Sequence, residues 1–206
     1  MALRSIRTIF TISLITILWS TIIPAGNVHA LTGHFNSVDL PDLDVFIEQV
    51  KNGQADELRG IYIPGILAAR VVQQPSGMAG FISPWQNVVT QFSLAAKVGS
   101  TGLLAHNYLA GKSFALLQDG QEIHLVNGDG KISTFIVSEI LQFQVLEPSS
   151  ALSPFMDLEN GNILTYTELF TKVYDRPGQV VFQTCIVADG NPAWGRLFIV
   201  AEPDPK

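Results

Sequence analysis

The segment Val180-Val181-Phe182-Gln183-Thr184-Cys185 is a mostly apolar, β-branched run that ends in the chain's only cysteine. Eleven residues later, Arg196 opens a second such run, Arg196-Leu197-Phe198-Ile199-Val200-Ala201. Upstream, a third run, Thr101-Gly102-Leu103-Leu104-Ala105, ends in His106. Runs of this length and composition predict β-strands. A thiol, a guanidinium and an imidazole are therefore each expected at the edge of a strand.

These three side chains each have a structural and a functional interpretation. A lone cysteine cannot form a disulfide within its own chain, so Cys185 is either buried and inert or kept for its reactivity. Taken separately, His106 is typical of a strand-end histidine and Arg196 of a surface charge. Taken together, the three supply a nucleophile, a base and a charge stabiliser.

The first thirty residues have the composition of a secretory signal. Arg4 and Arg7 give a positive start, an uncharged and mostly apolar stretch covers residues 8–25, and Val28-His29-Ala30 offers small residues to a signal peptidase. We expect cleavage after Ala30. The alternative is an uncleaved membrane anchor, for which the stretch is only marginally long. In both cases residues 31–206 are expected outside the cytoplasm, secreted or at the cell surface.

The charge of the exported part excludes one class of partner. The whole chain has a formal net charge of −6, and without residues 1–30 it keeps 10 basic and 18 acidic residues. An acidic surface repels phosphate backbones, which argues against nucleic acid as a partner. The 176 residues that remain of 206 without the first 30 favour one domain with a sizeable core.

Residues 31–57 predict a linker followed by an amphipathic helix. Pro41 is suited to the first turn of a helix, and Gly53 to its end. Between them, apolar residues recur at helical spacing, at Leu43, Phe46, Ile47 and Val50.

From Leu58 to the last residue, short strand-like runs alternate with turns. Asn127-Gly128-Asp129-Gly130 lies between two such runs and predicts a hairpin. Short helical turns are expected at 113–117 and 166–173. This pattern favours an all-β barrel or sandwich, with strands expected at 61–65, 68–72, 88–92, 102–107, 122–126, 132–146, 180–185 and 196–201.

The order His106, Cys185, Arg196 resembles that of a sortase, the cysteine transpeptidase of bacterial surfaces. The resemblance rests on Ile61-Tyr62-Ile63-Pro64, on Leu103-Leu104-Ala105-His106-Asn107 followed by Gly111-Lys112-Ser113-Phe114-Ala115-Leu116-Leu117, on Thr184-Cys185 and on Gly195-Arg196-Leu197-Phe198-Ile199-Val200. It departs from the family at Val181-Phe182-Gln183, where Thr-Leu-x is more usual, and at Asp119-Gly120, which reverses the usual order. The resemblance implies a closed β-barrel of about eight strands over residues 58–206.

The resemblance also implies an activity. Cys185 would attack a sorting motif of the Leu-Pro-x-Thr-Gly kind in a secreted protein, His106 would transfer the protons, and Arg196 would stabilise the substrate or the oxyanion. The resulting thioester would pass to an amine on the cell surface or on another protein. The alternatives are a secreted cysteine hydrolase on the same scaffold, and a non-catalytic barrel that binds peptides.

Two further expectations concern the surroundings of this site. No cofactor is expected, and no metal site, because no two ligand-type residues share a suitable local spacing with a third. Residues 186–195 are expected to form a loop that folds back and brings Cys185 and Arg196 to one rim of the barrel.

Overall fold

The computed structural model describes residues 40–150 and 152–206. The predicted signal segment and residues 31–39 of the predicted linker lie outside this part. No helix within these two ranges is long and apolar enough to cross a bilayer. In chain order, the elements are α1 (Leu43–Val50), β1 (Leu58–Ile63), β2 (Leu67–Gln73), β3 (Val88–Phe92), α2 (Ser93–Lys97), β4 (Thr101–Leu104), α3 (Gly111–Phe114), β5 (Glu122–Asn127), β6 (Ile132–Val145), β7 (Phe155–Asp157), β8 (Ile163–Leu164), α4 (Tyr166–Tyr174), β9 (Val180–Ala188) and β10 (Asn191–Pro203).

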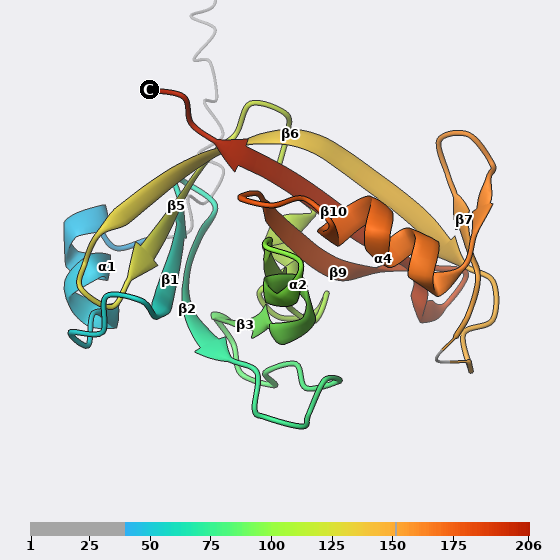
Figure 1. Cartoon of the computed structure of the whole chain (residues 1–206), viewed down its shortest axis with the longest axis horizontal. Coiled ribbons are helices and arrows are strands. Elements are labelled where there is room, and N and C mark those ends of the chain that lie inside the picture. The colour runs from blue at the N-terminus through green and yellow to red at the C-terminus, as the bar shows by residue number, and fades with distance from the viewer. Residues whose placement is uncertain (1–39, 151) are drawn as a thin grey trace, which may run out of the picture. The chain divides into compact units, whose positions relative to one another are not determined.

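Eight of these strands close into a barrel, as the sequence predicts. Their order around it is β10-β9-β4-β3-β2-β1-β5-β6, and the ladder between β6 and β10 closes the ring. The pairs β2–β3 and β4–β9 are parallel and the others are antiparallel, so the barrel is mixed. Figure 1 shows β6 and β10 as the two long strands that cross the molecule side by side.

Successive side chains along β9 and β10 belong alternately to two hydrophobic clusters. Phe182 of β9 and Ile199 of β10 belong to the core inside the barrel. Val181 and Phe198, their neighbours along the chain, belong to a second cluster on the outer face, beneath α4. Successive strand residues point to opposite faces, so β9 and β10 each serve both clusters.

The N-terminal helix α1 forms as the apolar spacing predicts, and it packs on the outer face of β1 and β5 (Figure 1). Phe46 and Val50 are its buried residues. The close approach requires a glycine at position 60, because a Cβ there would lie 2.8 Å from the Phe46 ring and 3.0 Å from Val50.

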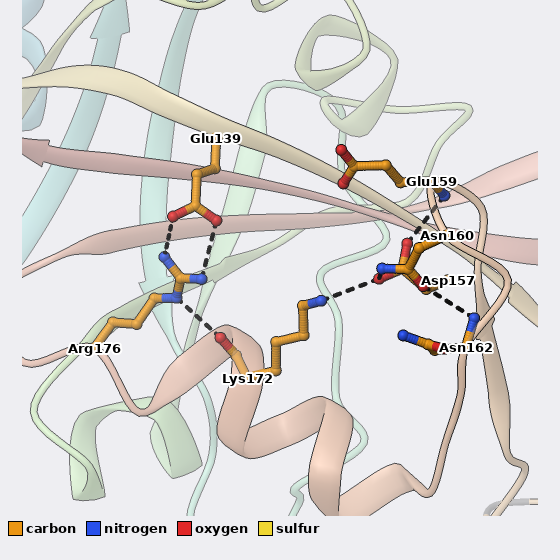
Figure 2. A network of polar contacts seen from close by, with 7 residues as sticks. All are labelled: Glu139, Asp157, Glu159, Asn160, Asn162, Lys172 and Arg176. Atoms are coloured by element: carbon orange, nitrogen blue, oxygen red, sulfur yellow. Dashed lines mark hydrogen bonds and ion pairs between the residues drawn. The ribbon is translucent and has the colours of Figure 1, made fainter.

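Polar contacts hold α4 across β6 and β7 (Figure 2). Arg176, just after the helix, donates from both terminal nitrogens to Glu139 of β6, at 2.7 and 3.0 Å, and from Nε to the carbonyl of Lys172. Lys172 in turn donates from Nζ to Asp157 of β7 at 3.0 Å. A capping box between Thr165 and Glu168 begins the helix.

Two carboxylates of this network favour the ionised form. The hydrogen bonds from Arg176 outweigh desolvation and lower the pKa of Glu139. Burial alone would raise the pKa of Asp157, but hydrogen bonds from Lys172 and from the Glu159 backbone, together with the charge of Lys172, lower it. The end of α4 is therefore fixed by charged pairs whose acidic members stay ionised.

Candidate active site

Cys185 and Arg196 come from the neighbouring strands β9 and β10, and His106 lies two residues after the end of β4, the strand on the other side of β9. Cys185 of β9 is the direct partner of Arg196 in the antiparallel β9–β10 ladder. On the other side of β9, Leu104 of β4 is level with Gln183 in a parallel ladder. The Ala105 amide also donates to the Gln183 carbonyl, so the chain still follows β9 one residue beyond the ladder, and continuation of this register would bring His106 level with Cys185. Adjacent strands lie about 4.8 Å apart, and His106, Cys185 and Arg196 together are called the candidate row.

The row lies on the outer face of the barrel. On β9, Val180 and Phe182 point into the barrel, so Cys185 points outward with Val181. On β10, Arg196 shares the outward side with Phe198. The β9–β10 register is regular from Gly195 to Ala201, so no bulge reverses these directions near Cys185.

The connection between Cys185 and Arg196 differs from the predicted loop. β9 continues past the cysteine to Ala188, and β10 already begins at Asn191, so the two strands form a hairpin. The reversal occurs at Asp189 and Gly190, both with positive φ, of 54° and 73°. Glycine and aspartate are among the residues that adopt such angles most readily. The pairing between Asn191 and Gly195 is irregular, so this part of β10 lacks the alternation by which a strand is recognised in a sequence. Cys185 and Arg196 therefore lie within strands, not at their ends.

Arg196 is half-buried, and its guanidinium contacts the backbone of its own hairpin. Nη1 donates to the carbonyl oxygens of Ala193 at 3.2 Å and Gly195 at 2.9 Å. Both bonds come from one nitrogen of a group with five N–H donors. Among the described residues, the Nε and Nη2 donors have no protein acceptor, which leaves them for a substrate oxygen.

His106 lies at the point where the chain leaves β4 and turns toward α3. The Ala105 amide still donates to the Gln183 carbonyl at 3.2 Å, and the His106 carbonyl then accepts from the amides of Leu109 and Gly111. Its ring stacks on that of Tyr108, with 5.2 Å between centroids and 18° between planes. A hydrogen bond from Asn107 Nδ2 to the Pro192 carbonyl, 3.0 Å long, joins this turn to the β9–β10 hairpin.

Thr184 fixes the position of the cysteine from inside the barrel. It is 4% exposed and lies against Gly111, where an added Cβ would come within 2.3 Å of its Oγ1. The same Cβ would lie 2.6 Å from the His106 carbonyl oxygen. Gly111 thus lets the His106 turn and the Thr184–Cys185 peptide approach each other closely.

An aromatic cleft leads along the outer face to Arg196. It encloses about 270 Å3 between α4 and the sheet, with Gln183 and Arg196 on its floor. Its aromatic lining residues are Phe92, Phe155, Tyr166, Phe170, Tyr174 and Phe198. The cleft is suited to apolar side chains of an extended ligand, with polar groups at the end nearest Cys185.

A second cavity, of about 490 Å3, reaches Cys185 itself together with Asn107, Ile186 and Val187. Cys185 is partly exposed. The aromatic cleft is lined by its ladder partner Arg196 and by Gln183, two residues before it, and not by Cys185 itself.

Gln183 and Tyr174 belong to this site and were not singled out from the sequence. The Tyr174 hydroxyl donates to Gln183 Oε1 at 2.5 Å, which ties α4 to β9 two residues before the cysteine. Burial raises the pKa of the Tyr174 phenol well above its ordinary value, so the hydroxyl keeps its proton. Alternation from Cys185 back to Gln183 is the signal that places this glutamine on the thiol's face.

No family model and no curated protein matches this sequence. The structure is similar to solved sortases. It resembles sortase A of Listeria monocytogenes, with 14% identity, a TM-score of 0.46 and coverage of 72% of this chain and 88% of that one. It also resembles a sortase D5 transpeptidase of Clostridium perfringens, with 18% identity, a TM-score of 0.45 and coverage of 79% and 86%.

Sortase C1 of Streptococcus suis is a third similar structure, with 15% identity, a TM-score of 0.49 and coverage of 80% of this chain and 79% of that one. Similarity at this level of identity concerns the fold alone. The chemistry of the site has to be argued from the row of residues in this chain.

Proposed function

We propose that this chain is a sortase-like cysteine transpeptidase. The observation that carries the proposal is the pairing of Cys185 with Arg196 on the outer face of the barrel, beside an aromatic cleft that Arg196 lines, with His106 just after the neighbouring strand β4. A thiol, an imidazole and a guanidinium in this arrangement can carry out acyl transfer through a covalent intermediate. The order of the three residues, which resembles that of the sortases, agrees with this chemistry.

In the first half-reaction, the Cys185 sulfur attacks a backbone carbonyl carbon of an extended peptide. The carbonyl becomes an oxyanion, to which the Nε and Nη2 donors of Arg196 are available as hydrogen-bond donors. The C–N bond then breaks, and His106 gives its proton to the departing amine. The acyl group remains on sulfur as a thioester.

In the second half-reaction, an incoming amine attacks the thioester and His106 accepts its proton. The C–S bond breaks, a new amide forms and the thiolate is restored. Water in place of the amine gives hydrolysis with the same residues. We assign the aromatic cleft to the peptide that precedes the scissile bond, because it ends at Arg196 and Gln183, and a sorting motif in a secreted protein is the substrate that the resemblance implies.

The test is incubation of the full chain with a library of sorting-type peptides, with and without an added amine, followed by mass spectrometry. We expect an acyl adduct on Cys185 and a product in which the amine replaces the peptide's C-terminal part. An acyl adduct with only hydrolysed product, for every amine tried, would establish the hydrolase instead. Peptide binding without any adduct or product would establish the non-catalytic barrel.

A further inference from the structure

A concave surface whose lining contains none of His106, Cys185 and Arg196 has no role in the chemistry above, although it shares Lys112 with the cavity that reaches Cys185. It is a cavity of about 520 Å3 between α1, β2, the start of β3 and α3. Apolar residues of α1 and β2, including Phe46 and Leu67, form part of its wall. Arg70 of β2 and Lys112 of α3 bring two positive charges to the same cavity.

These two charges are unusual among the described basic residues. Ten lysines and arginines lie in residues 40–150 and 152–206, and six of them form an ion pair with a carboxylate. Arg196 donates to backbone carbonyls. Within these ranges, Arg70, Lys97 and Lys112 remain without a carboxylate partner, and two of the three line this one cavity.

No acidic residue lines the cavity within the described part of the chain, although the protein contains 18 of them. Among the residues of 40–150 and 152–206, no carboxylate forms an ion pair with Arg70 or Lys112. Arg70 lies on the outer face of β2, because its neighbours Ala69 and Val71 point into the core. Both basic side chains are exposed enough to meet a ligand.

Neutral hydrogen-bond donors complete the lining. Gln49, Gln86 and Asn87 contribute amide side chains, and Ser113 contributes a hydroxyl. Ser113 is 8% exposed and lines the cavity together with the two basic residues. These neutral side chains supply hydrogen-bond donors for a polar ligand.

We propose that this cavity binds a phosphate group. The planar fork of an arginine and the point charge of a lysine together match a multiply charged oxyanion better than a single carboxylate. The neutral donors can satisfy the remaining oxygens, and the apolar wall can contact the organic body that carries the group. A soluble phosphate ester and the headgroup of an anionic lipid share this chemistry.

Titration of the full chain with inorganic phosphate at low salt tests the proposal. Binding is followed by calorimetry and by NMR shifts of the amides at 70, 112 and 113. We expect Arg70→Gln and Lys112→Gln each to weaken binding at least tenfold. Lys97→Gln is the matched control, because it removes an unpaired lysine outside the cavity, and it should change binding less than twofold. Circular dichroism and melting temperature confirm that each variant is folded.

The absence of saturable binding, or equal losses in all three variants, would overturn the proposal. Acetate should bind at least tenfold more weakly than phosphate, and equal affinity would replace the phosphate assignment with a general anion site. Vesicles of phosphatidylglycerol and of phosphatidylcholine distinguish the two sources. If Arg70→Gln and Lys112→Gln reduce binding only to phosphatidylglycerol, the phosphate belongs to a lipid. If vesicle binding is unchanged and only free phosphate binding falls, it belongs to a soluble ester.

Discussion

Cys185 lies directly opposite Arg196 in the β9–β10 ladder, and both side chains point away from the barrel core. Directly opposed residues of an antiparallel pair have Cα atoms about 4.5 to 5.5 Å apart. The backbones of the two residues therefore lie side by side wherever the hairpin is formed. The relative position of the two groups depends on backbone hydrogen bonds, which side-chain substitutions leave in place.

Cys185→Ala should abolish turnover and leave the fold nearly intact. The side chain is partly exposed on the outer face, so its removal opens no core cavity. Peptide cleavage with and without amine measures turnover, and thermal melting measures the fold. A variant that keeps full activity would exclude Cys185 as the nucleophile.

Arg196→Lys should lower kcat by a factor of about 10² to 10³, as the loss of an oxyanion donor does elsewhere. An ammonium group cannot reproduce the fork of donors. The measurement is kcat for the best library peptide, with Arg196→Ala beside it. If both variants retained most activity, Arg196 would be a surface charge without a role in catalysis.

His106→Ala should slow the alkylation of Cys185 by a thiol reagent near neutral pH, because a neighbouring imidazole supports thiolate formation. His124→Ala is the matched control. That histidine pairs with Glu122 on β5 and stacks on Tyr62, on another part of the barrel. Equal alkylation rates in wild type and His106→Ala would show that the two groups do not interact.

Gly111→Ala should destabilise the chain by about 1 to 3 kcal/mol, as overpacking of a tight site usually does. The added methyl group would lie 2.3 Å from Thr184 Oγ1 and 2.6 Å from the His106 carbonyl oxygen. Urea unfolding measures the loss. Gly120→Ala is the comparison for steric overlap, because a Cβ there meets nothing within 4 Å. Its φ of 77° adds backbone strain of another kind. Activity should fall more in Gly111→Ala, because only that change displaces the His106 turn.

Acid should weaken the attachment of α4 through Asp157. Its pKa in the folded chain lies below the ordinary 3.8, so its contribution to stability is complete above that value. The contribution is lost as the pH falls through the lower folded pKa, where the carboxylate takes up a proton. Unfolding free energy measured from pH 6 to pH 2 should therefore fall less steeply in Asp157→Asn than in wild type. The control is Asp44→Asn, an exposed aspartate on α1; a wild-type slope in Asp157→Asn would contradict the assignment.

Much of the barrel was predictable because its strands alternate strongly. The expected strand at 88–92 matches β3, and the Asn127-Gly128-Asp129-Gly130 hairpin joins β5 and β6. By contrast, β8 has two residues and β7 three, which is too short for a periodic pattern. The pairing of β7 with β6 and of β8 with β7 comes from tertiary packing.

The candidate site, like the barrel, could be predicted from the sequence only in part. Residue chemistry selected His106, Cys185 and Arg196 as candidates, and local alternation places Gln183 on the same face of β9 as Cys185. The parallel register of β4 with β9 joins residues about eighty positions apart, so no local pattern shows that the strand leading to His106 lies beside β9. Tyr174 and Phe92 join the cleft only because α4 lies over the sheet.

Closure of the barrel through β10 has a consequence for how the protein is made. A chain that emerges from a ribosome or a translocation pore arrives N-terminus first, so residues 191–203 arrive after every other strand of the barrel. Until then β6 and β9 are open edges with unpaired amides and carbonyls, which are templates for aggregation. Folding of this chain should therefore depend on shielding of these edges until the last strand has arrived, and Cys185 and Arg196 can pair only when folding is complete.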